Sequence, residues 1–251
     1  MKIYTLILAT FITVPLMGQF KINQSSGKIS FYEVNAVSFE GHSGSEILIS
    51  PEDDDFEKPE RAEGLKLISP AGIVDNSGIG LSVVTEGSET AVHQISSRSD
   101  TRYTVKVPAG VSIYYECTTH AGRTVMVQDL ASELEISANF NSVELERVSG
   151  PLAISTVHGS IEADFTEISQ DNSISLHSVH NHVDVSVPSD AKASFRLNTS
   201  WGEMFTDLDL DYGQRDDLRQ ISSKKIAGKF NGGGVDFSLT STHDDIYLRK
   251  K

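Results

Sequence analysis

The stretch Leu134–Phe165, LEISANFNSVELERVSGPLAISTVHGSIEADF, decides the fold class. Apolar and polar residues alternate in short runs, and Gly, Asn or Ser separates one run from the next. A period of two places alternate side chains on opposite faces of a β-strand, whereas a helix repeats at about 3.6 residues. Similar runs recur along the chain after Gly18, with few helix signals between them. The sequence therefore predicts an all-β protein.

One short phrase recurs at the turns between these runs. A ring residue comes first, then Gly, Asn or Asp, then a polar residue, then an aliphatic residue or Met that opens a strand. Gly, Asn and Asp tolerate the backbone angles of tight turns. The phrases are Phe140–Val143, His158–Ile161, His180–Val183, Trp201–Met204 and His243–Ile246.

The spacing of the phrases predicts stacked repeats. The turn residues Asn141, Gly159, Asn181, Gly202 and Asp244 lie 18, 22, 21 and 42 positions apart, and we read the last gap as two periods. A period of about 20 residues is typical of a β-solenoid. The rival is a β-sandwich, whose strands also recur at short spacing. We favour the solenoid, in which Val143, Ile161, Val183 and Met204 would form one buried parallel ladder.

Composition limits the class of protein. The chain has 251 residues, is 38% hydrophobic and carries a net charge of −14. This suits one or two globular domains with a real core and excludes a disordered chain. The acidic charge gives no electrostatic basis for binding nucleic acid or an anionic membrane surface. The single cysteine, Cys117, can form no intrachain disulfide, and its apolar neighbours predict a buried, inert thiol.

The first 18 residues, MKIYTLILATFITVPLMG, predict a secretory signal peptide. Lys2 supplies the positive charge, Ile3–Met17 is an apolar run, and Gly18 is a small residue at a plausible cleavage point. We expect a mature chain over 19–251, with a less regular part at 19–101 and regular coils at 102–251. We expect no transmembrane segment in it, and secretion across the inner membrane to the periplasm or the cell surface.

Four stretches carry a resemblance to a known family. The chain resembles the bacterial "putative adhesin" domain family over about Lys21–Lys250, a group of secreted β-helical proteins without an established biochemical activity. The resemblance implies a single-stranded, right-handed parallel β-helix of the pectate-lyase type, and no catalytic motif to carry over. Asn181-His182 departs from the pattern, because Gly is more usual there. The stretches are RYTVKVPAGVSIYYE (102–116), LASELEISANFNSVELERVSGPLAISTVHGSIEADF (130–165), HNHVDVSVPSDAKASFRLNTSWGEMFTDLDL (180–210) and GKFNGGGVDFSLTSTHDDIYLRKK (228–251).

Histidines form the first candidate site. His177, His180 and His182 fall within six residues, but zinc needs three or four ligands that converge at about 2.0–2.1 Å, and this spacing does not require that. The repeat explains His180 as one member of a ring position at successive turns. In a solenoid, the rings at this position should stack as a column along one edge. His158, His180 and Trp201 are the candidate ligand-binding edge for sugars, the alternative that we favour being that the rings only cover the turn backbone and seal the coil ends. We expect no metal or cofactor.

Carboxylates form the second group of candidates. Alternation predicts Asp207, Asp209 and Asp211 on one face of a strand, as a calcium or basic-ligand contact or, the reading we favour, as a polar surface. Glu162 with Asp184, or Asp207 with Asp209, could reach the carboxyl separation of a glycosidase. No catalytic motif accompanies them.

These observations predict a non-enzymatic secreted β-solenoid, an adhesin or an envelope-associated binding or structural module. Its partners would be glycans or envelope and surface proteins. The alternative is a carbohydrate-active enzyme, a polysaccharide lyase or hydrolase, on a β-helix.

Overall fold

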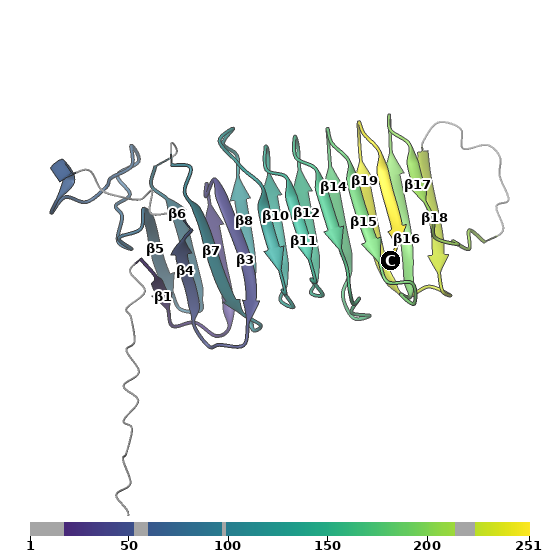
Figure 1. Ribbon diagram of the computed structural model, residues 1–251, viewed down its shortest axis with the longest axis horizontal. Helices are drawn as coiled ribbons and strands as arrows, with labels where there is room; N and C mark the ends of the chain where they lie inside the picture. The colour runs from purple at the N-terminus through teal and green to yellow at the C-terminus, as the bar shows by residue number, and fades with distance from the viewer. Residues whose placement is uncertain (1–17, 53–59, 97–98, 214–223) are drawn as a thin grey trace, which may run out of the picture.

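The computed structural model describes residues 18–52, 60–96, 99–213 and 224–251, and these form an elongated all-β body (Figure 1). Its described strands build two mixed sheets of ten strands each, and the segment Glu60–Ala62 (η2) forms a 3-10 turn. The all-β prediction is confirmed. The predicted signal peptide, apart from Gly18, lies outside the described residues. Within the described ranges, no helix is long and apolar enough to cross a membrane.

The first sheet, sheet A, contains strands from both ends and from the middle of the chain. In spatial order its strands are β1 (Phe20–Ile22), β4 (Ile47–Pro51), β7 (Arg102–Pro108), β3 (Ala36–His42), β9 (Val125–Gln128), β11 (Val143–Glu146), β13 (Ile161–Asp164), β15 (Val183–Val187), β20 (Ile246–Lys250) and β17 (Met204–Thr206).

The second sheet, sheet B, follows a matching order. From the same end its strands are β5 (Leu81–Glu86), β6 (Glu89–Gln94), β2 (Gly27–Tyr32), β8 (Val111–Cys117), β10 (Leu134–Ala138), β12 (Leu152–Thr156), β14 (Ile174–Ser178), β19 (Val235–Ser241), β16 (Ala193–Thr199) and β18 (Lys224–Phe230).

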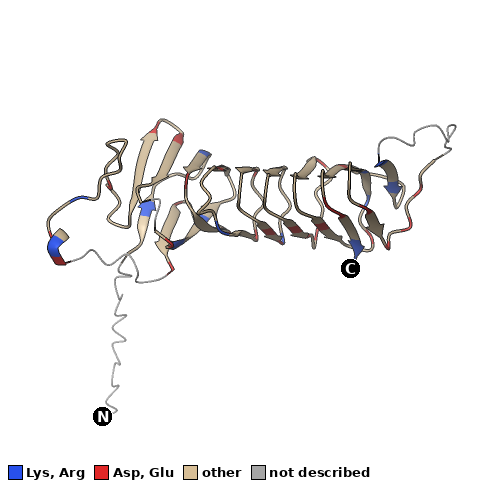
Figure 2. Ribbon diagram, turned by 90° about the horizontal axis from the view of Figure 1, so that it is seen from above, with Lys and Arg blue, Asp and Glu red and all other residues tan. Residues whose placement is uncertain are grey.

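The middle of the molecule is regular. From β8 to β15 the chain passes alternately between sheet B and sheet A (Figure 2), and each strand from β8 to β13 pairs in parallel with the strand two elements later. Val143 pairs with Ile161, and Ile161 pairs with Val183, and all three are fully buried. The predicted ladder is therefore confirmed for these three residues.

The predicted single-stranded, right-handed parallel β-helix is wrong. The described strands form two open mixed sheets, not a closed solenoid, and antiparallel pairs join β1 to β4, β4 to β7, β5 to β6 and β16 to β18. The physical reason is that the periodic turns govern only the middle of the chain. At both ends the strands reverse direction, and strands distant in sequence pair side by side.

The clearest case is the C-terminal part of the chain. Strand β20 lies between β15 and β17, so Ile246 pairs with both Val183 and Met204. Strand β19 lies likewise between β14 and β16. The 42-position gap before Asp244 is therefore not two periods along the stack. The chain forms β16 and β17 first, and the later strands occupy the place between them and the middle.

The core lies between the sheets, and the two outer faces differ. One apolar cluster runs from Ile22 to Leu248 along the whole described body. The outer face of sheet A carries charged residues such as Glu144, Glu162 and Asp184, whereas that of sheet B carries small residues such as Ser155 and Ser175. Figure 2 shows the charged positions gathered on one of the two layers. Cys117 is buried as predicted, and desolvation raises the pKa of its thiol.

Candidate functional site: a ring-lined edge and the hollow beside it

Five rings stack along one edge of the molecule, where the chain turns from sheet B into sheet A. Neighbouring ring centroids are 4.7–6.3 Å apart and the planes differ by only 8–19°. All five side chains are exposed, Trp201 by 73% and Phe140 by 41%. This ring column consists, in spatial order, of Phe140, His158, His180, His243 and Trp201.

Strand register explains the column. Adjacent strands in a sheet are about 4.7–4.9 Å apart, which is also a favourable spacing for stacked rings. Equivalent turns of paired strands therefore bring their rings into contact. The predicted alignment of Phe140, His158, His180 and Trp201 is confirmed, but His243 lies between His180 and Trp201 because β20 lies between β15 and β17.

Buried hydroxyl groups hold the turns in this register. Ser178 Oγ donates to the carbonyl of Gly159 in the neighbouring turn (2.8 Å) and accepts the N–H of Asn181 in its own turn (3.1 Å). Three further hydroxyl groups make the same pair of bonds with their own and a neighbouring turn. This hydroxyl ladder consists of Thr156, Ser178, Thr199 and Ser241.

The hydroxyl ladder was missed by the sequence reasoning, although a signal was present. A Ser or Thr stands two residues before four of the five rings, in TVHG, SVHN, TSWG and STHD. Before Phe140 the position is Ala138, and here the side chain of Asn141 makes the link instead. Its Nδ2 donates to the carbonyl of Arg123 (2.6 Å) and to the hydroxyl of Tyr115 (3.0 Å).

The stacking determines which ring surfaces a ligand can reach. Inside the column each ring covers the faces of its neighbours, so His158, His180 and His243 present their edges to solvent. Only the two end residues have an open face, Phe140 on the side of β9 and Trp201 on the side of the molecular end. A neutral imidazole offers one N–H donor and one nitrogen acceptor in its plane. The column therefore combines two apolar end faces with a polar row of imidazole edges.

The clustered histidines do not converge on a common point. His180 lies in the column, and its ring is nearly parallel to those of His158 and His243, so the three rings cannot all direct a nitrogen at one ion. His177 is on β14 in sheet B, while the ring of His182 lies 3.5 Å from the carboxylate of Glu162. Across the described ranges, no group of three or more His, Cys, Asp or Glu could hold a metal ion.

The structure places the first carboxylate pair on neighbouring strands. Glu162 and Asp184 are register partners on β13 and β15. Asp184 accepts hydrogen bonds from Arg249 Nε, at 2.8 Å to Oδ1 and 3.1 Å to Oδ2, and from Nη2 at 2.9 Å, and this contact raises the pKa of the guanidinium.

The stretch with three aspartates is not the strand that alternation predicted. Strand β17 ends at Thr206, and in the described residues that follow it, up to Gly213, an isolated bridge joins Asp211 to Lys229. The alternation itself is kept, because Leu208 and Leu210 are buried while Asp207 and Asp209 are exposed. Asp207 accepts the backbone N–H of Lys250 (2.7 Å). The favoured reading, a polar surface over packed leucines, agrees with this burial, and contacts of Asp207 and Asp211 also anchor the segment to β20 and β18.

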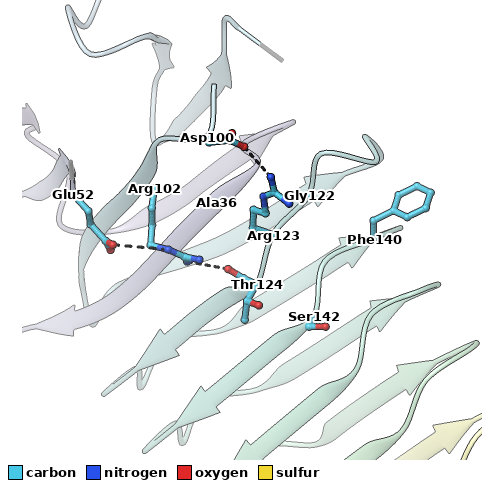
Figure 3. Close-up of a pocket in the computed structure, with 9 residues that line it drawn as sticks. All are labelled: Ala36, Glu52, Asp100, Arg102, Gly122, Arg123, Thr124, Phe140 and Ser142. Atoms are coloured by element: carbon cyan, nitrogen blue, oxygen red, sulfur yellow. Dashed lines mark hydrogen bonds and ion pairs between the residues drawn. The ribbon is translucent and has the colours of Figure 1, made fainter. Parts of the chain in front are cut away.

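A polar hollow of about 510 Å³ continues the edge beyond Phe140 (Figure 3). Arg102 Nη1 donates to the carbonyls of Thr124 (2.9 Å) and Val37 (3.4 Å), and its Nε lies 3.8 Å from Glu52. Arg123 Nη2 donates to Asp100 at 3.0 Å. This arginine hollow is lined by Ala36, Glu52, Asp100, Arg102, Gly122, Arg123, Thr124, Phe140 and Ser142.

The arginine hollow was also missed by the sequence reasoning, and here no local signal existed. Its lining comes from the beginnings of β3, β7, β9 and β11 and from the residue after β4. Only the pairing of these strands brings the residues together.

Comparison with known proteins supports the fold. No family model and no curated protein matches the chain. Among solved structures it is similar to a protein from Clostridium sporogenes described as a "putative cell adhesion protein", with TM-score 0.50 and 8% identity over 93% of this chain and 99% of that one. It is also matched to a "putative adhesin" from Bacteroides fragilis, with TM-score 0.35 and 8% identity over 93% and 96% of the two chains. The first likeness indicates a shared fold.

Proposed function

We propose that this protein is a non-enzymatic secreted binding module that attaches to glycans through its ring-lined edge. The observation that carries the proposal is the column of five exposed, stacked rings. The fold shared with a protein described as a cell adhesion protein agrees with an adhesive role. The resemblance to secreted adhesin domains and the predicted signal peptide support a location in the periplasm or at the cell surface.

The chemistry of the ring column suits carbohydrate better than an apolar ligand. A sugar has apolar C–H faces and a rim of hydroxyl groups. The open faces of Phe140 and Trp201 can pack against such C–H faces. Imidazole edges between them can donate to and accept from hydroxyl groups, because each neutral ring carries one donor and one acceptor. The rigid turns hold these groups in place, which lowers the entropy lost on binding.

The carboxylates support binding over hydrolysis as the role of this chain. A glycosidase needs one carboxyl group that is protonated when it meets the substrate. Both oxygens of Asp184 accept hydrogen bonds from the guanidinium group of Arg249. Both carboxylates of this pair are therefore engaged within the protein, Asp184 by Arg249 and Glu162 by the ring of His182 at 3.5 Å.

A glycan array with three proteins tests this proposal. The wild type should bind at least one glycan, and Trp201→Ala should weaken that binding about 10-fold or more, since stacked and edge-on aromatic contacts dominate such sites. The matched control is Tyr114→Ala, which removes a ring from the outer face of sheet B, away from the column. Equal binding by the wild type and Trp201→Ala would refute the role of the column.

A further inference from the structure

We infer that the arginine hollow is a subsite for a carboxylate-bearing sugar, a uronic acid unit of the glycan. This inference rests on the proposed function and names the class of glycan. It begins with position. Phe140 is both the last ring of the column and part of the wall of the hollow, and its open face lies on the side away from His158. A glycan that follows the column past Phe140 therefore enters the hollow.

The hollow offers more hydrogen-bond donors than acceptors. Among its contacts with described residues, the Arg123 side chain uses only one hydrogen of Nη2, on Asp100, so the second Nη2 hydrogen and the Nε and Nη1 hydrogens remain available, and one parallel pair among them is free. Arg102 uses Nη1 for two backbone carbonyls, which leaves Nη2 available. Arg102 begins β7 and Arg123 precedes β9, and Figure 3 shows both among the residues that line the hollow. A guanidinium group with unused parallel N–H groups matches a carboxylate, which accepts two such bonds at once.

The acceptors in the hollow are largely occupied by the protein itself. Glu52 Oε1 accepts hydrogen bonds from Ser38 (3.1 Å) and Thr104 (2.8 Å), and its Oε2 faces Arg102. Asp100 is the exception, because its side chain is 76% exposed and pairs only with Arg123 among described residues. An exposed ion pair of this kind contributes little to stability, so a ligand carboxylate can share or replace it at low cost.

The register of Arg123 relative to the column is fixed by buried contacts. The amide of Asn141, next to Phe140, donates to the backbone carbonyl of Arg123, and the N–H of Arg123 donates to Asn35 at 2.7 Å. Asn141 is fully buried. The ring that would pack against the sugar and the arginine that would bind its carboxylate are thus held on one rigid frame.

The test compares uronate oligosaccharides with their methyl esters, which keep the sugar ring but lose the charge. A panel of oligogalacturonate, alginate and hyaluronan fragments, each beside its ester, is titrated into the full chain by calorimetry. At least one acid should bind about 10-fold or more tightly than its ester, the range for charge-assisted hydrogen bonds. Arg123→Gln should remove that preference by weakening binding of the acid much more than binding of the ester. Arg196→Gln is the matched control, because Arg196 is similarly exposed and paired with Asp236 on the outer face of sheet B.

A second variant is expected to strengthen binding, a result that misfolding cannot produce. Asp100→Asn removes a carboxylate that repels the ligand and releases Arg123, so it should strengthen binding of the acid by about 2–5-fold, the value of an exposed ion pair. Esters that bind as well as acids, or Arg123→Gln that binds acids as the wild type does, would overturn the subsite. If the subsite fails in this way but Trp201→Ala still abolishes glycan binding, the proposed function of the ring column is retained. No binding to any member of the panel would also overturn the subsite. The glycan array tests the role of the ring column independently of this result.

Discussion

The regular middle of the molecule and its C-terminal end use the same contacts to join different neighbours. In the middle, β13 pairs with β11 and β15, the strands two elements before and after it. At the end, β20 pairs with β15 and β17, which precede it by many residues in the chain. Yet Ser241 donates to Asn181 in the inserted part as Thr156 donates to Asn141 in the middle. The hydroxyl contacts at the turns therefore determine how two neighbouring turns pack together. They do not determine which turns become neighbours.

Core truncation should separate the two regions most strongly. Ile161 lies between buried Val143 and Val183, whereas Ile246 lies between Val183 and the half-buried Met204. We expect Ile161→Ala to lower the free energy of unfolding by about 3–5 kcal/mol and Ile246→Ala by about 2–3 kcal/mol, because the cavity beside Met204 can collapse more easily. Urea unfolding curves measure both. A loss at Ile246 that equals or exceeds the loss at Ile161 would show that the inserted strand is packed as tightly as the middle.

The hydroxyl ladder should behave alike in both regions. Ser178→Ala in the middle and Ser241→Ala in the inserted part each leave one backbone carbonyl and one backbone N–H group without the hydroxyl partner. Each substitution should cost about 1–3 kcal/mol. Thermal and urea unfolding test this, with the exposed Ser155→Ala, expected within about 0.5 kcal/mol, as the control. If the two substitutions lower the free energy of unfolding by different amounts, the hydroxyl contact does not play the same role in the middle and in the inserted part.

The ion pair that joins the two regions should matter least. Arg249 on β20 holds Asp184 on β15, and their side chains are 53% and 26% exposed. A double-mutant cycle with Asp184→Ala and Arg249→Ala should give a coupling energy of about 0.2–1 kcal/mol, falling as salt is added. A coupling well above this range, or one insensitive to salt, would mean that the pair helps to select β20 as the neighbour of β15.

Sequence reasoning succeeded where a contact depends on residues close in the chain or on one period. Alternation identified Val143, Ile161 and Val183 as core and Asp207 and Asp209 as surface. The ring phrase identified the column, although its order required β20 to be placed. Sequence reasoning failed for β16 to β20. A gap of 42 positions is equally consistent with two further repeats and with a later strand that pairs beside an earlier one.

By itself, the sequence determined the all-β class, the inward and outward faces of the strands and the ring that begins each turn. These depend on local geometry, since a period of two and a turn residue act within a few positions. Only the tertiary structure decided that the sheets are mixed and open, that His243 lies between His180 and Trp201, and that Arg102 and Arg123 meet beside Phe140. These three features depend on pairing between strands that are distant in the sequence. Strands with the same spacing and the same turn hydroxyl can pair with more than one partner, so the sequence alone does not select the partner.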